Sequence, residues 1–240
     1  IGRWAKSVDA SMPEMCDHGI EIKDGRHLLI EGTPDPVDYG MGRCAKSGDQ
    51  QSIALLTGAN SGGKTTMLEL LAHCTILAHM GLPVPAKIAK IGRIESLHVL
   101  AKAGGTQSAG ALEQTLLQLA QVVSNDDSKL ILADELEAIT EPGAGARIIA
   151  GMLEAAESHE GTCMLLVTHL APSIINAAGK ELRTDGIEAR GLDENLELIV
   201  DRTPRRNYLA KSTPELIVRR LVERSDGEAK DVFKSILGRF

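Results

Sequence analysis

Aromatic residues are scarce in this sequence: its 240 residues include one Trp, two Tyr and two Phe. Proteins that bind single-stranded nucleic acid stack the unpaired bases on aromatic rings, so this scarcity argues against such binding by the chain. The core must instead be built from Leu, Ile, Val, Ala and Met. A hydrophobic content of 43% suffices for one large α/β domain or two small ones.

Long apolar runs are missing as well. No run approaches the roughly 20 residues that a helix needs to span a bilayer, and no signal peptide is visible. We therefore expect a cytoplasmic protein without a membrane partner. The sequence begins at Ile1 rather than Met, and we expect it to be either a fragment of a longer chain or a processed chain.

Cysteine is limited to four widely spaced residues, Cys16, Cys44, Cys74 and Cys163. The absence of a C-x-x-C pair argues against a structural metal site. We expect all four to be small, buried or half-buried thiols in a reducing compartment.

Positive charge is concentrated at one end of the chain. The formal net charge is −7, but residues 201–240 contain ten Lys and Arg against six Asp and Glu, which leaves −11 for residues 1–200. The body of the protein should repel DNA phosphates. Contact with nucleic acid is therefore expected from the basic tail or from parts of the protein outside this chain.

One glycine-rich segment matches the phosphate-binding pattern G-x-x-x-x-G-K-[ST]. It stands between the apolar run 52–57, a predicted strand, and a predicted helix over 65–79. The alternative is a glycine-rich turn that caps an ordinary helix, but the flanking strand and helix favour the phosphate loop. The residues predicted to bind nucleotide are Gly58, Ala59, Asn60, Ser61, Gly62, Gly63, Lys64, Thr65 and Thr66.

The chemistry of this loop follows from its residue types. Its glycines let the backbone wrap closely around a phosphate, and the following helix adds the positive end of its dipole. Lys64 is expected to neutralise the β- and γ-phosphates, and the Thr65 hydroxyl is expected to hold Mg²⁺.

Two further polar pairs follow short apolar strands. Asp134 and Glu135 come directly after the run 129–133, and Thr168 and His169 come after the run 162–167. In open α/β sheets ligands lie beyond the carboxyl ends of the strands, so both pairs and the loop should meet at one edge. Asp134 is expected to ligate Mg²⁺, Glu135 to polarise the attacking water, and His169 to contact that water or the γ-phosphate.

Each of these assignments has a structural alternative. An Asp-Glu pair is also common at an ordinary turn after a strand, and a single histidine is common at a surface or in a core.

The remaining pattern predicts the elements around the site. Residues 20–30 alternate across Asp24-Gly25 and predict a hairpin, and residues 32–51 predict a long loop against which the nucleobase rests. A helix is expected over 112–123 and a second hairpin from the segments 187–190 and 196–200. Two short helices are expected at about 214–224 and 228–238.

With these residues in place, the chain resembles the C-terminal ATPase domain of the DNA mismatch-repair MutS family, a branch of the ABC-type ATPases. The segment Thr57–Thr65 keeps the family loop T-G-P-N-x-G-G-K-[ST] except that Ala59 replaces Pro. The segments 78–86 and 89–92 match the family pattern after the loop helix, A-H-x-G-x-x-V-P-A followed by A-x-I-G.

The family's signature region, S-T-F followed by Glu, is similar to Ser108-Ala-Gly110 with Glu113, where Gly110 replaces Phe. The resemblance implies that Ser108 contacts the γ-phosphate bound by the other subunit and that Asn60 lies near the γ-phosphate and assists catalysis. A plain helix cap is the alternative for Ser108. After the Asp-Glu pair the family has G-R-G-T-S, whereas this chain has Leu136-Glu-Ala-Ile-Thr140.

The resemblance implies a P-loop NTPase of the α/β class with a mostly parallel central sheet and flanking hairpins. The ATPase domain is expected over 1–205, with its signature region at 104–123, followed by a helical, helix-turn-helix-like dimerisation tail over 206–240. It further implies a Mg²⁺-dependent ATPase that works as a homodimer with composite sites in DNA mismatch repair or recombination. DNA would bind to domains absent from this chain, with a nucleoid-associated location.

Two other hypotheses remain at this point. One is an ABC-type nucleotide-binding subunit of another system, which the absence of an L-S-G-G-Q signature disfavours. The other is a dimerisation scaffold gated by nucleotide, which would not need a water-activating carboxylate such as Glu135.

Overall fold

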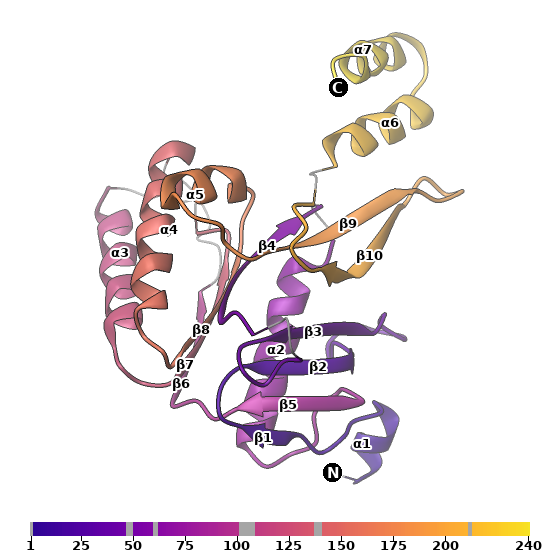
Figure 1. Ribbon diagram of the computed structural model, residues 1–240. Coiled ribbons are helices and arrows are strands. Elements are labelled where there is room, and N and C mark those ends of the chain that lie inside the picture. The colour runs from indigo at the N-terminus through magenta and orange to yellow at the C-terminus, as the bar shows by residue number, and fades with distance from the viewer. Residues whose placement is uncertain (1, 47–49, 60–61, 101–108, 137–140, 211–212) are drawn as a thin grey trace.

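The computed structural model describes residues 2–46, 50–59, 62–100, 109–136, 141–210 and 213–240. The described strands form a six-stranded and a four-stranded sheet, and helices pack against both (Figure 1). The chain is therefore a mixed α/β protein, as its sequence predicts.

The six-stranded sheet carries the polar pairs and the glycine-rich loop. Its order is β10-β9-β4-β8-β7-β6, and all neighbours are parallel except β10 with β9. Every residue of β4 and β8 is buried, because helices cover both faces, which explains their continuous apolar sequences. The bounds are β4 Ile53–Gly58, β6 Ser96–Leu100, β7 Lys129–Asp134, β8 Thr162–Val167, β9 Thr184–Leu192 and β10 Leu198–Arg205.

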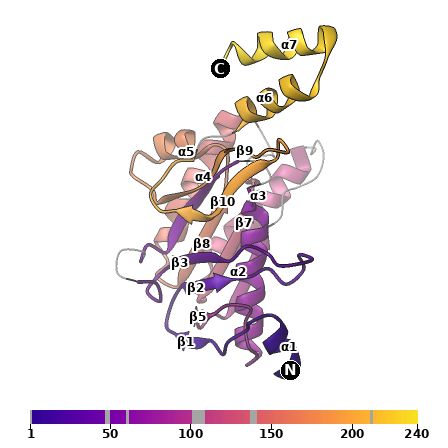
Figure 2. The same cartoon turned by 90° about the vertical axis from the view of Figure 1, so that its right-hand side faces the viewer.

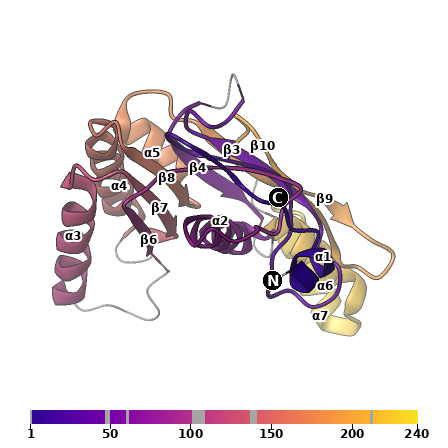
Figure 3. The same ribbon diagram turned by 90° about the horizontal axis from the view of Figure 1, so that it is seen from below.

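Two apolar clusters cover this sheet. On one face α3 (Ala109–Ser124), α4 (Pro142–Glu157) and α5 (Ala171–Ala178) contribute to the cluster that includes Leu153 and Ile174. On the other face α2 (Lys64–His79) contributes Leu68 and Leu71. Figure 3 shows α2 on the opposite side of the sheet from α3, α4 and α5. This packing fixes the start of α2 against the ends of the central strands.

The four-stranded sheet has the order β1-β5-β2-β3 and packs on the second face of α2. The prediction of a hairpin over residues 20–30 was wrong. Strand β2 continues through Gly25 and pairs antiparallel with both β3 and β5, while Arg26 donates its backbone N–H to Pro85 O. Asp24 has a φ of +50° at a register shift rather than in a two-residue turn. The bounds are β1 Glu14–Cys16, β2 Ile20–Gly25, β3 Val37–Met41 and β5 Ile88–Gly92.

The segment predicted as a long loop over 32–51 contains strand β3. Strand β3 lies at the edge of its sheet and is only partly buried. An edge strand tolerates nearby glycine and proline, so this segment has the composition of a loop and its sequence does not predict a strand.

The prediction of four thiols was also wrong. Cys16 and Cys44 form a disulfide, with their Cα atoms 6.0 Å apart, whereas Cys74 and Cys163 are free and buried. Cys16 ends β1, and the backbone N–H of Cys44 donates to His18 O at 2.8 Å. The pairing of β2 with β3 brings these distant residues together, which the spacing of the cysteines does not reveal.

The C-terminal part agrees with the sequence. The second predicted hairpin is confirmed as β9 and β10, and the two predicted helices are α6 (Pro214–Arg224) and α7 (Gly227–Leu237). These helices project from the body, at the opposite end from the short helix α1 (Gly2–Ser7) (Figure 2). Neither α6 nor α7 has a buried residue. No helix among the described residues has the length and apolarity to cross a membrane.

Candidate functional site

The glycine-rich loop connects β4 to α2 and has the backbone shape that its glycines permit. Gly58 has a φ of +133°, and a Cβ at this position would lie 2.9 Å from the carbonyl carbon of Ile187. Gly63, the N-cap residue before α2, lies in the left-handed region with φ 91° and ψ 17°, and no described side chain caps the helix. The loop therefore presents the N-terminus of α2, which attracts anions.

Lys64 folds back over this loop. Its side chain is 6% exposed, and Nζ donates to Gly58 O and to Ala59 O at 2.9 Å each. The ammonium group thus lies inside the curve of the loop, where it can neutralise a bound phosphate.

Thr65 and Asp134 meet although they belong to different elements. Thr65 lies in the first turn of α2 and Asp134 ends β7, and the Thr65 hydroxyl donates to Asp134 Oδ2 at 2.6 Å. A hydroxyl and a carboxylate are hard oxygen ligands of the kind that Mg²⁺ takes from a protein when phosphates and waters fill its other positions. In the described part of the chain, no three His, Cys, Asp or Glu side chains cluster to hold a metal without such help.

Glu135 and His169 form the second pair. His169 Nε2 lies 2.7 Å from Glu135 Oε1, and the side chains are 35% and 17% exposed, respectively. Glu135 has a φ of +46°, and its N–H donates to Val167 O at 3.0 Å. This unusual backbone turns the carboxylate from the end of β7 toward the end of β8. A carboxylate and an imidazole in contact can together orient a water molecule.

The structure therefore brings the loop and both polar pairs to one edge of the sheet, as the order of the strands predicts. Asp134 is the register partner of Val167, the last residue of β8. The predicted contributions of Asn60, Ser61 and Ser108 lie outside the described residues, as do positions 137–140. Thr66 lies in the first turn of α2 and lines a cavity beside the loop.

That cavity has a volume of about 240 Å³ and lies between the start of α2 and the segment 25–37. Its walls include Val37 and Leu70 as apolar side chains and Asp35 and Arg202 as charged ones. The sequence predicted that a nucleobase rests against residues 32–51 but gave no indication of Arg202 or His27, which also line the cavity. No local pattern reveals Arg202, because it reaches this cavity only when β10 packs over β3.

A larger cavity, about 750 Å³, opens at the opposite edge of the sheet. Ser52, Thr162 and Thr184 line it, at the amino ends of β4, β8 and β9. None of the described motif residues lines this cavity, so its size does not make it the candidate site.

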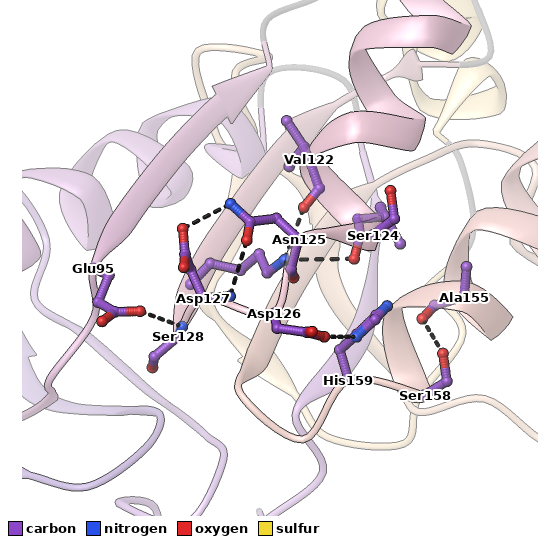
Figure 4. A network of polar contacts seen from close by, with 12 residues as sticks. Glu95, Val122, Ser124, Asn125, Asp126, Asp127, Ser128, Ala155, Ser158 and His159 are labelled. Carbon is purple, nitrogen blue, oxygen red and sulfur yellow. Dashed lines mark hydrogen bonds and ion pairs between the residues drawn. The ribbon is translucent and has the colours of Figure 1, made fainter.

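A polar network fixes the other end of β7 to α3. Lys129, the first residue of β7, is fully buried and donates to the carbonyls of Val122 and Asn125 at the end of α3. Figure 4 shows the bonds around this turn, including the contact of Asp126 with His159 at 3.1 Å. Burial lowers the pKa of Lys129. The strand that presents Asp134 and Glu135 is thereby tied to α3, which lies largely within the predicted signature region 104–123.

Comparison with known proteins places these features in a family. The model for MutS domain V matches residues 54–202. The DNA-binding protein MutS2 of Pyrococcus furiosus is 43% identical over 238 residues, which cover 97% of this chain and 41% of the relative. A putative endonuclease MutS2 of Bacillus subtilis is 32% identical, over 72% of this chain and 22% of the relative.

A DNA mismatch repair protein MutS, from Acetivibrio thermocellus, is 31% identical over 66% of this chain and 19% of its own length. The chain therefore spans about two fifths of the Pyrococcus relative and about one fifth of the other two relatives.

Proposed function

The chain belongs to the MutS family through its domain V, and we propose that it is a Mg²⁺-dependent ATPase with a P-loop NTPase fold. The observation that carries this proposal is the meeting of Thr65 with Asp134 and of Glu135 with His169 at the mouth of one glycine-rich loop. Each contact joins motifs that lie far apart in the sequence. Together they supply phosphate binding, metal ligation and water activation.

The binding roles follow from the geometry. The described backbone on either side of the loop, residues 58–59 and 62–66, would bind the triphosphate together with the Lys64 ammonium and the N-terminus of α2. Thr65 and Asp134, whose oxygens are joined by a 2.6 Å hydrogen bond, would hold Mg²⁺. When bound, this ion neutralises charge on the β- and γ-phosphates.

Glu135 and His169 activate the attacking water. Glu135 accepts a hydrogen bond from that water and increases the negative charge on its oxygen as the bond to the γ-phosphorus forms. His169, in contact with Glu135, holds the carboxylate in this orientation and is proposed to contact the attacking water or the γ-phosphate. The bond between the γ-phosphorus and the bridging oxygen of ADP breaks as the new bond forms, so that oxygen leaves with ADP and the products are ADP and phosphate.

The 240 Å³ cavity is the place for the nucleoside. It adjoins Thr66 on one side and the apolar side chains of Val37 and Leu70 on another, so a base there continues from phosphates bound by the loop.

We further propose that the working unit is a homodimer. Helices α6 and α7 have exposed apolar side chains, Leu221 at 36%, Val232 at 57% and Ile236 at 38%, and neither helix has a buried residue. A second copy of this helix pair covers such a surface. The predicted contact of Ser108 with the nucleotide of the other subunit makes each ATP site composite.

The wider role is in DNA transactions. The relatives are named as a DNA-binding protein, an endonuclease and a mismatch repair protein. We propose that ATP turnover in this chain switches DNA contacts made by domains outside it, because its own body carries an excess of negative charge.

The test is ATP turnover per mole of protein across a range of protein concentrations, for the unaltered chain and for Glu135→Gln. We expect specific activity to rise with concentration and to vanish in Glu135→Gln, while both chains bind ATP. Glu95→Gln is a matched control, because Glu95 accepts a bond from Ser128 N at the far end of the sheet. Unchanged turnover in Glu135→Gln contradicts the proposed role of Glu135, and binding without turnover in either chain favours a nucleotide-gated scaffold.

A further inference from the structure

Arg202 belongs to β10 but extends away from its own hairpin. Its neighbour Asp201 accepts a bond from Arg190 of β9 at 2.6 Å, which holds that side chain along the hairpin. Successive residues of a strand point to opposite faces, so Arg202 points to the other side. There Arg202 Nε donates to Asp35 Oδ2 at 3.0 Å, in the segment that lines the nucleoside cavity.

The guanidinium also lies beside the phosphate loop. A Cβ placed on Gly63 would be 3.2 Å from one terminal nitrogen of Arg202, and both residues line the same cavity. Gly63 is the N-cap residue directly before α2. A planar cation is therefore held where the helix N-terminus and the cavity meet, a position suited to a phosphate oxygen.

The contact between Arg202 and Asp35 is easily exchanged. The two side chains are 44% and 69% exposed, and exposed ion pairs contribute little to stability because water and salt screen them. A phosphate offers Arg202 a comparable or better partner, since a guanidinium can donate two parallel bonds to phosphate oxygens.

The order of groups along the site identifies which phosphate Arg202 reaches. Lys64 lies within the loop, where the β- and γ-phosphates bind, whereas Thr66 and Arg202 line the cavity proposed for the nucleoside. Between these two places lies the phosphate attached to the ribose. We propose that Arg202 exchanges Asp35 for the α-phosphate of the bound nucleotide, so that the C-terminal hairpin supplies a nucleotide-binding residue to the loop of its own chain. This inference rests on the proposed binding of ATP.

The experiment measures the affinity for ADP and for ATP of the full chain and of four variants. Arg202→Ala should lower the affinity for ADP and for ATP by the same factor, about tenfold or more, because both nucleotides carry the α-phosphate and the variant loses a charge-assisted hydrogen bond to it. The affinity of Arg202→Lys should lie between those of the unaltered chain and Arg202→Ala, because lysine keeps the charge but lacks the planar guanidinium. Arg190→Ala removes a similar surface arginine from the same hairpin and should bind as the unaltered chain does.

The variant Asp35→Asn distinguishes nucleotide binding by Arg202 from a purely structural role of the Arg202–Asp35 ion pair. If Arg202 binds the nucleotide, Asp35→Asn frees it and ADP affinity stays unchanged or increases. If the pair merely holds the wall of the cavity, Asp35→Asn and Arg202→Ala weaken ADP equally, and the proposal is wrong. Unchanged affinity in Arg202→Ala also overturns it, whereas absence of binding by the unaltered chain overturns the proposed ATP site itself. Thermal unfolding of each variant checks that the fold is retained.

Discussion

The hydroxyl of Thr65 lies 2.6 Å from the carboxylate of Asp134, although 69 residues separate them in the sequence. The contact exists because α2 begins at the carboxyl end of β4, and β7 reaches the same edge of the sheet two strands away. Parallel strands bring their carboxyl ends together whatever the distance along the chain. This relationship gives the site its proposed metal-binding pair.

Replacing either member of this pair should impair Mg²⁺ use. Removing a group that only supports a metal ligand costs about 10- to 100-fold in metal affinity, so Thr65→Val or Asp134→Asn should cost at least as much. The measurement is ATP turnover as a function of Mg²⁺ concentration. Asp126→Asn, at the far end of β7, should leave the Mg²⁺ dependence unchanged. An unshifted Mg²⁺ curve for Asp134→Asn would rule out the assigned ligand.

The contact between Glu135 and His169 predicts a loss of rate rather than of binding. His169→Ala should lower kcat by roughly 100-fold or more, because it acts on the attacking water, while ADP affinity is retained. His159→Ala is the matched control, since His159 also contacts a carboxylate, that of Asp126, away from the site. Equal rates for both variants would remove His169 from the mechanism.

Gly58 should not tolerate a side chain. Its φ of +133° and the 2.9 Å approach of an added Cβ to the carbonyl carbon of Ile187 both oppose Gly58→Ala. We expect a loss of about 1–3 kcal/mol of stability and of nucleotide binding. Gly151→Ala is the control, because Gly151 lies in α4 with open space around it and should gain roughly 0.5–1 kcal/mol. Denaturant unfolding and ADP titration measure both effects, and normal binding by Gly58→Ala would contradict this loop geometry.

Three histidines with lowered pKa values should make the folded protein less stable at acidic pH. Burial is the main cause that lowers the pKa values of His18, His73 and His98 from the usual 6.5. As pH falls through 6.5, the unfolded chain takes up protons at these sites before the folded protein does. Protonation thus favours unfolding, and the free energy of unfolding should decrease from pH 7.5 to pH 5.5.

Denaturant unfolding at several pH values measures this decrease. His18→Gln, His73→Gln and His98→Gln each remove one of these groups, so each variant should show a shallower dependence on pH than the unaltered chain. Identical slopes in all four proteins would show that these histidines do not cause the effect.

The disulfide between Cys16 and Cys44 should stabilise the four-stranded sheet. It closes a segment with a sequence separation of 28, which corresponds to about 3–4 kcal/mol of lost freedom in the unfolded chain. For a protein of this size, we expect a reductant to lower Tm by roughly 10 °C. The double variant Cys16→Ser/Cys44→Ser should have the lower Tm from the start and should not respond to reductant. If reductant also lowers the Tm of this variant, the reductant does not act through the Cys16–Cys44 disulfide.

The elements that the sequence predicts well are those with a strong local signal. Strands β4, β7 and β8 are continuous apolar runs because both of their faces are covered, and the glycine-rich loop is recognised from its own eight residues. Strand β6 was missed, and none of its residues is fully buried. It forms a strand because it pairs in parallel with β7, and its own sequence carries no strong strand pattern.

The hairpin predicted at Asp24-Gly25 shows how a local rule can fail. Asp-Gly favours a tight turn, but β2 gains antiparallel partners on both sides, β3 and β5, that residues 26–30 do not replace. Pairing between distant segments outweighed the preference of two residues.

By itself, the sequence determined the α/β class, the position of the glycine-rich loop between β4 and α2, and the polar residues that end or follow β7 and β8. These features depend on short-range patterns and on the common direction of parallel strands. Only the tertiary structure decided that Cys16 pairs with Cys44 and that Arg202 reaches Asp35 beside Gly63. Such contacts depend on which strands become neighbours and how β10 crosses β3. Strand order is set by the packing of the whole core, and no local pattern encodes it.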